Sequence, residues 1–313
     1  MSPNDFECLW KFNILNQSVD ENLKGTYERE FLAYVSHEGA MCSVLVENAD
    51  NGQEKILAAL TSAFISPAFL SFIESSREPF VCRHLAGWIE HGQSPLLSYE
   101  NQASQSSELG LDMLVMEWTW DRSLSEEKQG EVKSLLLSQY VDRYSGMNIR
   151  SILAEPCIPE IQAILVTLKF ELLNPYEEWN SKFGNPGKFF PKLFKLYRTV
   201  ALKEISDRTL LDLFRWQKPK CKFTNRQLDV LERVRLGDPI DQISKELGLG
   251  RSHERTILSQ IYETIRQAYP GELLVADLEL RRELREFLIR HPWEVVPGVR
   301  RVENRKGRPR RLV

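Results

Sequence analysis

The stretch from Phe223 to Ile265 constrains the fold more than any other part of this chain. Its apolar residues recur at helical spacing in three short runs, which predicts three helices. Thr224 and Gln227 are spaced for a capping box, in which the threonine hydroxyl accepts from the backbone amide of Gln227 and the glutamine side chain reaches back. Gly248 suits a tight turn after the second helix, and the third is expected from about Ser252 to Ala268. This pattern predicts a helix-turn-helix.

The same stretch resembles the LuxR/FixJ/NarL class of helix-turn-helix, with which it shares Thr224, Arg226, Val230–Leu231, Gly237, Ile243, Leu247–Gly248–Leu249, Leu258 and Ile261–Tyr262. Sigma-factor region 4 shares part of the pattern and is the nearest alternative. The resemblance implies an all-α domain whose third helix enters the major groove of DNA. It implies DNA contacts by residues of that helix, namely Arg251, Ser252, His253, Arg255, Thr256, Ser259 and Gln260.

Glu254 departs from the family pattern, because it stands where the family places a buried valine. An unpaired buried carboxylate is costly. We therefore expect Glu254 to turn outward or to pair with a neighbour such as Arg251, unless the recognition helix sits differently. Residues 220–269 hold nine basic and seven acidic side chains, a net charge of +2. Non-specific attraction of these residues to phosphate should therefore be weak.

The C-terminal end is a basic tail on an acidic body. Residues 300–313 hold seven Arg or Lys and one Glu, a charge of +6, so the total of −3 leaves −9 for the remainder. The run from Lys306 to Arg311 resembles the AT-hook core, which implies minor-groove contacts by Lys306, Arg308 and Arg310. A generic phosphate-binding tail is the alternative. Residues 277–290 predict an amphipathic helix that packs on the helix-turn-helix or pairs two subunits.

Upstream, apolar runs of strand and helix character alternate along the chain. Strands are expected at Met41–Glu47, Lys55–Phe64, Leu111–Trp120, Asn148–Glu155 and Glu171–Asn174. Helices are expected from Ser66–Pro67, at Phe80–His91, Ser125–Tyr144 and Ile158–Phe170, and once or twice within Leu193–Trp216. The polar run Asn101–Glu108 predicts an exposed loop. The alternation of strands and helices implies an α/β layer.

The order of elements over about 110–175 resembles the core of GNAT-type acetyltransferases in topology. In that family a glycine-rich loop after the central strand holds the pyrophosphate of acetyl-CoA at a helix N-terminus. The corresponding stretch, Asp121–Gly130, lacks the glycine pair and carries Glu126 and Glu127 where the anion would sit. A shell retained for sensing or dimerisation is therefore the favoured interpretation.

Other candidate sites have ordinary explanations. The five cysteines include no CxxC pair, so neither a disulfide framework nor a zinc site is predicted. A structural role is preferred over metal binding for Cys82, His84 and His91. Glu117 and Asp121, near the end of the central strand, are equally consistent with a solvated rim. A core role is preferred over a ligand pocket for Trp118, Trp120, Phe170 and Trp179.

Together these patterns predict an α/β (α+β) N-terminal domain, GNAT-like or sensor-like, and an all-α C-terminal helix-turn-helix domain. The expected parts are 1–182 (sensor or oligomerisation), 183–219 (linker and connecting helices), 220–269 (helix-turn-helix), 270–299 (amphipathic helix) and 300–313 (tail).

The predicted protein is a cytoplasmic, nucleoid-associated transcription regulator and not an enzyme. It would bind double-stranded DNA as a homodimer, respond to a small-molecule or protein effector, and need no cofactor, metal or membrane. The alternatives are an acetyltransferase-like enzyme fused to a DNA-binding module and a nucleoid-type structural DNA binder.

Overall fold

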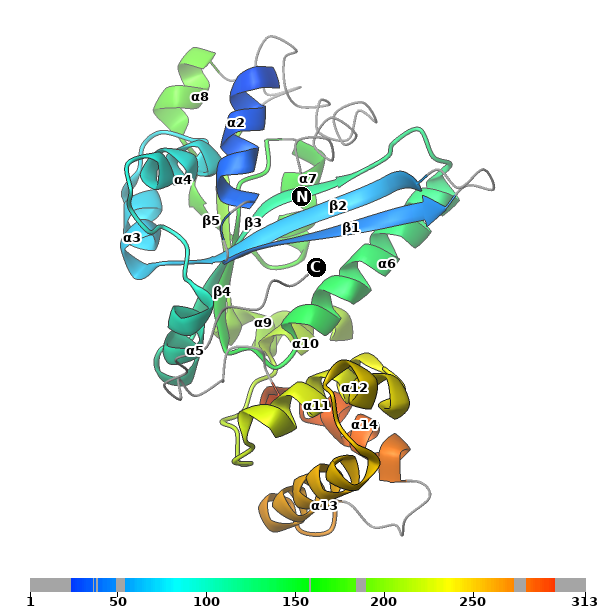
Figure 1. Ribbon diagram of the computed structural model, residues 1–313. Coiled ribbons are helices and arrows are strands. Elements are labelled where there is room, and N and C mark those ends of the chain that lie inside the picture. Colours follow the sequence, from blue (N-terminus) through cyan, green and yellow to red (C-terminus); the bar gives the residue numbers. More distant parts are fainter. Residues whose placement is uncertain are drawn as a thin grey trace.

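A six-stranded mixed sheet forms the centre of the molecule (Figure 1). The computed structural model describes residues 24–35, 37, 39–48, 54–157, 159–183, 190–272 and 280–295. The strands are β1 (Ala40–Asn48), β2 (Glu54–Ile65), β3 (Leu111–Trp120), β4 (Ile149–Ala154), β5 (Glu171–Asn174) and β6 (Leu193–Tyr197). Their order in the sheet is β1-β2-β3-β4-β6-β5, and β3 with β4 is the one parallel pair among them.

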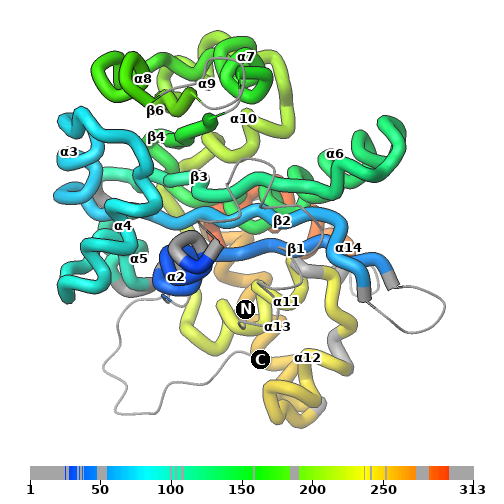
Figure 2. Tube along the Cα trace, turned by 90° about the horizontal axis from the view of Figure 1, so that it is seen from above, coloured from blue at the N-terminus to red at the C-terminus, as the bar shows by residue number. Residues whose placement is uncertain are grey.

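The first five strands lie where the apolar pattern predicts them. The hairpin expectation is also confirmed, since β1 pairs antiparallel with β2 from Ala40 opposite Ala63 to Asn48 opposite Glu54. Figure 2 shows β1, β2, β3, β4 and β6 following one another across the sheet. These strands alternate or fully bury their apolar residues, which is the pattern that packing on both faces of a sheet requires.

The sixth strand corrects the sequence analysis, which predicts helix for the whole of Leu193–Trp216. Its first five residues instead form β6, which lies between β4 and β5 and pairs antiparallel with both. Leu193, Phe194 and Leu196 are buried. Pairing with two neighbours overrides the local preference of a short apolar run. The sheet therefore extends to Tyr197, past the expected boundary at residue 182.

The run expected to be an exposed loop also differs, because Tyr99–Glu108 forms helix α5. Ser98 caps the helix by accepting from the backbone amide of Asn101. Two of its polar side chains are buried: Gln102 donates to the carbonyl of Leu97, and Ser106 accepts from Asn148. Polar composition indicates a solvated loop only when the polar groups lack partners inside the fold, and here they have partners.

Helices cover both faces of the sheet (Figure 1). The connecting helices are α2 (Lys24–Val35), α3 (Pro67–Ser75), α4 (Val81–Glu90), α6 (Glu126–Tyr144), α7 (Pro159–Thr167), α8 (Glu177–Phe183), α9 (Arg198–Glu204) and α10 (Arg208–Phe214). One core cluster joins the sheet to α2, α3 and α4 through Phe31, Phe69 and Leu85. A second joins it to α6 and α10 through Leu136 and Phe214.

The C-terminal helices α11 (Asn225–Leu236), α12 (Ile240–Glu246), α13 (Arg251–Ala268) and α14 (Leu280–Arg290), with the short 3₁₀ helix η3 (Pro292–Val295), share a separate core. The capping box is confirmed, since Thr224 N donates to Gln227 Oε1 at 2.8 Å and Gln227 N to Thr224 Oγ1 at 3.3 Å. Gly248 takes a left-handed φ of 62° at the turn. Leu284, Phe287 and Leu288 pack α14 on this core.

These helices lie against the end of α6, close to α9 and α10 (Figure 1). Trp293 of η3 belongs to the core cluster of the sheet and α6. The guanidinium of Arg235 donates to the carbonyl of Asp142 at 2.8 Å. Gly146 follows α6 with φ of 88°, and a Cβ there would lie 2.5 Å from backbone atoms of Pro292 and Trp293.

Replacing Gly146 with alanine is expected to cost about 2 kcal/mol of unfolding free energy, because the added methyl overlaps backbone and the φ is strained. Gly248→Ala is the matched control: its φ is also positive, but nothing lies within 4 Å of the added carbon. It should cost only about 1 kcal/mol from backbone strain. Urea unfolding measures both. Equal losses would mean that close approach to η3 adds nothing to stability.

Candidate active site

The two parallel strands part at a bulge in β3. β3 pairs with β4 from Leu111 to Val115, and beyond this point it continues along β2 alone. On the β2 side, Val115 lies opposite Ser62 and Glu117 lies opposite Thr61, so Met116 is the extra residue. A bulge redirects the side chains next to it. Glu117 therefore stands where β3 and β4 diverge.

Glu117 is a half-buried carboxyl group. Within the described residues no hydrogen bond or ion pair reaches its oxygens, and burial raises its pKa to about 8. Burial acts in this direction because it penalises the charged form of an acid. A carboxyl group with a pKa close to the working pH is suited to take up and release a proton during a reaction.

Glu155 follows β4 and faces the start of α4. Its two oxygens accept from the backbone amides of Phe80 at 3.0 Å and Val81 at 2.9 Å. Phe80, the N-cap residue, has φ of 73° and supplies no side-chain cap of its own. Glu155 therefore caps α4 from another part of the chain. Burial nevertheless raises the pKa of Glu155 to about 7, since it outweighs these hydrogen bonds.

Three further groups complete a cluster around these carboxyls. Cys157 interacts electrostatically with Glu155, Cys82 and Glu117. Burial raises the pKa of both thiols, so they stay protonated rather than forming thiolate nucleophiles. Tyr176 is 2% exposed, and burial and Glu155 raise its pKa too. Its hydroxyl interacts with the buried carboxyl of Glu155.

Asp121 differs from Glu117 because it has hydrogen-bonding and charged partners. It is 4% exposed. Burial alone would raise its pKa, but hydrogen bonds from Ser123 and Lys55 outweigh burial, and the pKa of Asp121 is lowered. The ammonium of Lys55 lies 3.0 Å from its Oδ2. Asp121 is therefore not a carboxylate of a solvated rim, and its partners differ from those of Glu117.

The loop that precedes α6 does not fit the pyrophosphate of acetyl-CoA. The carboxylate of Asp121 already accepts the backbone amide of Ser123, at 2.9 Å. The Gln129 side chain donates to the carbonyls of Arg122 and Leu124, which holds the loop closed. Glu126 and Glu127 occupy the first turn of α6, where their charge would repel an anion.

The predicted DNA-contacting residues share an exposed position on α13, except for Arg251, whose side chain lies outside the described residues. The exposed ones are Ser252, His253, Arg255, Thr256, Ser259 and Gln260. Lys306, Arg308 and Arg310 lie outside the described residues. Glu254 is half-buried and accepts from the hydroxyl of Ser244 at 2.6 Å, while its expected pairing with Arg251 lies outside the described residues.

The aromatic and histidine side chains considered as candidates from the sequence pack against other side chains of the fold. Trp118 and Trp120 pack on the cluster that contains Phe170, whereas Trp179 packs on the opposite cluster. They therefore do not line one pocket. His84 packs edge-on against Phe72. The part of the chain that the structure describes holds no group of three or more His, Cys, Asp or Glu arranged for a metal, and no helix long and apolar enough to span a bilayer.

No protein-family model matches this chain, and no curated protein matches it either. Similar solved structures include FeeM, an N-acyl amino acid synthase from uncultured soil microbes, with 11% identity over 63% of this chain and 92% of that chain and a TM-score of 0.32. Naa20 of Chaetomium thermophilum, in complex with a bisubstrate analogue, has 13% identity over 66% of this chain and 90% of that chain, with a TM-score of 0.34. A mutant of the Vibrio cholerae spermidine N-acetyltransferase SpeG has 10% identity over 65% of this chain and 95% of that chain, with a TM-score of 0.34.

The α/β architecture predicted for the N-terminal part is confirmed by the mixed sheet. The comparisons contradict the prediction that the protein is not an enzyme, because all three structures are N-acyl- or N-acetyltransferases. For the same reason the classification as a LuxR-type, DNA-binding transcription regulator is corrected. Double-stranded DNA, a homodimer and an effector as partners, and association with the nucleoid, stay predictions.

Proposed function

We propose that the α/β part of the chain transfers an acyl group from a thioester donor to an amine, with Glu117 as the general base. The supporting observation is the unpaired, half-buried carboxyl of Glu117 at the bulge where β3 and β4 diverge. The pairing of β3 with β4 ends at Val115 opposite Ala154, two residues before Glu117.

In the proposed reaction the amine nitrogen attacks the carbonyl carbon of the thioester. A C–N bond forms, the C–S bond breaks, and the carboxylate of Glu117 takes the proton that the amine loses. The departing sulfur takes up the proton that Glu117 has accepted, which restores the carboxylate of Glu117. The products are an amide and a free thiol. General acid–base catalysis of this kind typically contributes factors of about 10² to 10⁴ in rate.

The proposed donor is a thioester, and the group that carries the thioester is left open. The polar groups of the loop from Asp121 to Ser125 are hydrogen-bonded within the loop and to Gln129, so the loop offers no free donors to a pyrophosphate. An amine is proposed as the acceptor because it loses a proton as it attacks, and the carboxyl of Glu117, with its pKa raised to about 8, can accept that proton.

The full chain should be incubated with a panel of acyl thioesters and primary amines. Release of free thiol and appearance of the amide, by mass spectrometry, are the two readouts. We expect both to depend on the protein and to appear in equal amounts. Thiol release without amide, or amide formed equally well by a Glu117→Gln variant, would overturn the proposal.

The rate of amide formation is expected to rise with pH and to level off above about 8. The reason is that Glu117 must be ionised to accept a proton, and burial raises its pKa to about 8. Initial rates measured between pH 6 and pH 9.5 at saturating amine test this. Amines of different basicity are compared so that the ionisation of the amine itself can be separated from that of Glu117. A profile that follows only the ionisation of each amine would contradict it.

A further inference from the structure

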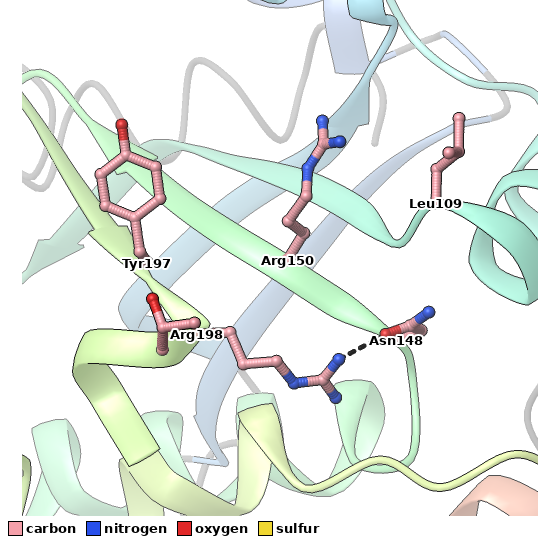
Figure 3. A pocket seen from close by; sticks show the side chains of 6 residues that line it. Leu109, Asn148, Arg150, Tyr197 and Arg198 are labelled. Atoms are coloured by element: carbon pink, nitrogen blue, oxygen red, sulfur yellow. Dashed lines mark hydrogen bonds between the residues drawn. The ribbon is translucent and has the colours of Figure 1, made fainter. Parts of the chain in front are cut away.

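A hollow of about 210 Å³ opens at the opposite end of β3 and β4 from Glu117. Asn148 and Arg150 come from the start of β4, and Tyr197 and Arg198 come from the junction of β6 with α9 (Figure 3). The remaining lining residues are Leu109 and Thr199. No carboxylate is among these lining residues. The side chains of Arg150 and Tyr197 point the same way, whereas that of Arg198 runs toward Asn148 (Figure 3).

The charge of Arg150 is already neutralised. Its Nε donates to Asp112 Oδ1 at 3.1 Å, and its Nη2 pairs with Asp112 Oδ2. Asp112 is fully buried and also accepts from the hydroxyl of Ser151 at 2.5 Å. Arg150 therefore shapes one wall of the hollow, but it contributes little net charge there.

Arg198 is different because its partners are neutral. Its Nε and Nη2 donate to the carbonyl of Phe214 at 3.0 and 2.8 Å, and its Nη1 donates to Asn148 Oδ1 at 2.5 Å. The side chain is half-buried, and burial lowers its pKa. No carboxylate among the described residues forms an ion pair with it. These bonds use three of the five guanidinium N–H groups, so two remain.

We propose that this hollow binds a carboxylate or phosphate group of a small organic molecule, with Arg198 as the charged ligand. A planar guanidinium matches both of these anions by paired N–H donors. The hydroxyl of Thr199 can donate to a remaining oxygen of the anion. Leu109, which is 64% exposed, offers an apolar surface to the rest of the molecule. The site is separate from Glu117 and does not depend on the proposed acyl transfer.

The test is thermal unfolding and isothermal titration of the full chain with inorganic phosphate and with acetate, against chloride at equal ionic strength. A ligand that binds only the folded state raises the Tm in proportion to occupancy. We expect one of the two anions to give saturable heat and a saturable rise in Tm beyond chloride. Which of them does so identifies the group that the site prefers.

Arg198→Lys should weaken binding of the preferred anion at least tenfold, because lysine keeps the charge but loses the planar pair of donors. Thr199→Val is the second variant, since it leaves the bonds of Arg198 to Phe214 and Asn148 in place; we expect about a threefold loss. Arg266→Gln, which removes an exposed arginine on α13, is the control and should change nothing.

Binding that is equal in the wild type, Arg198→Lys and Thr199→Val would overturn the proposal. So would a Tm that follows ionic strength alone, with no difference between phosphate, acetate and chloride. If Arg198→Lys does not fold, Thr199→Val decides the outcome by itself.

Discussion

Replacing Glu117 with glutamine is expected to lower the rate of acyl transfer by a factor of about 10² to 10⁴. Glutamine has nearly the same size and shape, but its amide cannot accept the proton that the attacking amine must lose. The expected loss is in the catalytic rate rather than in affinity for either substrate, because the carboxylate acts only as the bond forms. Steady-state kinetics that separate kcat from KM measure this.

The stability of the same variant gives an independent check. The pKa of Glu117 is raised in the folded protein from an ordinary value of 4.5 to about 8. Its contribution to stability is therefore fully present below pH 4.5 and is lost as the pH rises through 8, because the folded state resists ionisation. Glu117→Gln does not ionise, so it should be at least as stable as the wild type at pH 9.

Two results would count against Glu117 as the base. One is a variant that unfolds more readily than the wild type at pH 9, which would indicate a structural role. The other is an equal loss of activity in Glu171→Gln, an exposed carboxylate on the edge strand β5 that serves as the matched control.

Arg150→Gln is expected to lower the free energy of unfolding by about 3 kcal/mol, because it leaves the charge of Asp112 without its cationic partner. The Asp112 side chain is 0% exposed and the Arg150 side chain is 43% exposed. Ser151 remains as a hydrogen-bond donor to Asp112, so the loss should be near the lower end for a broken buried pair. Chemical denaturation at neutral pH measures it.

Arg215→Gln is the control for this prediction. It removes an ion pair with Asp212 in which both side chains are largely exposed, at 59% and 42%. Exposed pairs contribute only about 0 to 1 kcal/mol, because water screens them. Similar losses in Arg150→Gln and Arg215→Gln would show that burial of Asp112 does not govern the energy of its pair.

Local chemistry explains why much of the fold can be predicted. The capping box of Thr224 and Gln227 involves neighbours in the chain, and it forms as expected. Ser66 followed by Pro67 opens α3 for the same reason, with the Ser66 hydroxyl accepting from Phe69 N. The strand Leu111–Trp120 has the same bounds in the sequence analysis and in the structure. Such features depend on spacing alone.

The elements that were missed depend on distant partners. β6 looks helical by itself and becomes a strand because β4 and β5 bind it on both edges. α5 looks like a loop because of its polar residues, whose partners include Asn148, more than forty positions away. No window of local sequence contains these partners, so periodicity and composition could not identify them.

The candidate site likewise combines features visible in the local sequence with features that depend on distant parts of the chain. From the chain alone, Glu117 and Asp121 are two similar acids four positions apart. In the fold, burial raises the pKa of one, and Ser123 and Lys55 lower that of the other. The bulge at Met116 and the parting of β3 from β4 could be read only from strand pairing.

The sequence by itself determined the three helices of Phe223–Ile265, because caps, glycine turns and helical period act between near neighbours. It also determined the strands of the central hairpin and β3, through the alternation and length of their apolar runs. Only the tertiary structure decided which acid could act as a base. The reason is that desolvation and charge pairing depend on groups that the fold brings together from distant parts of the chain.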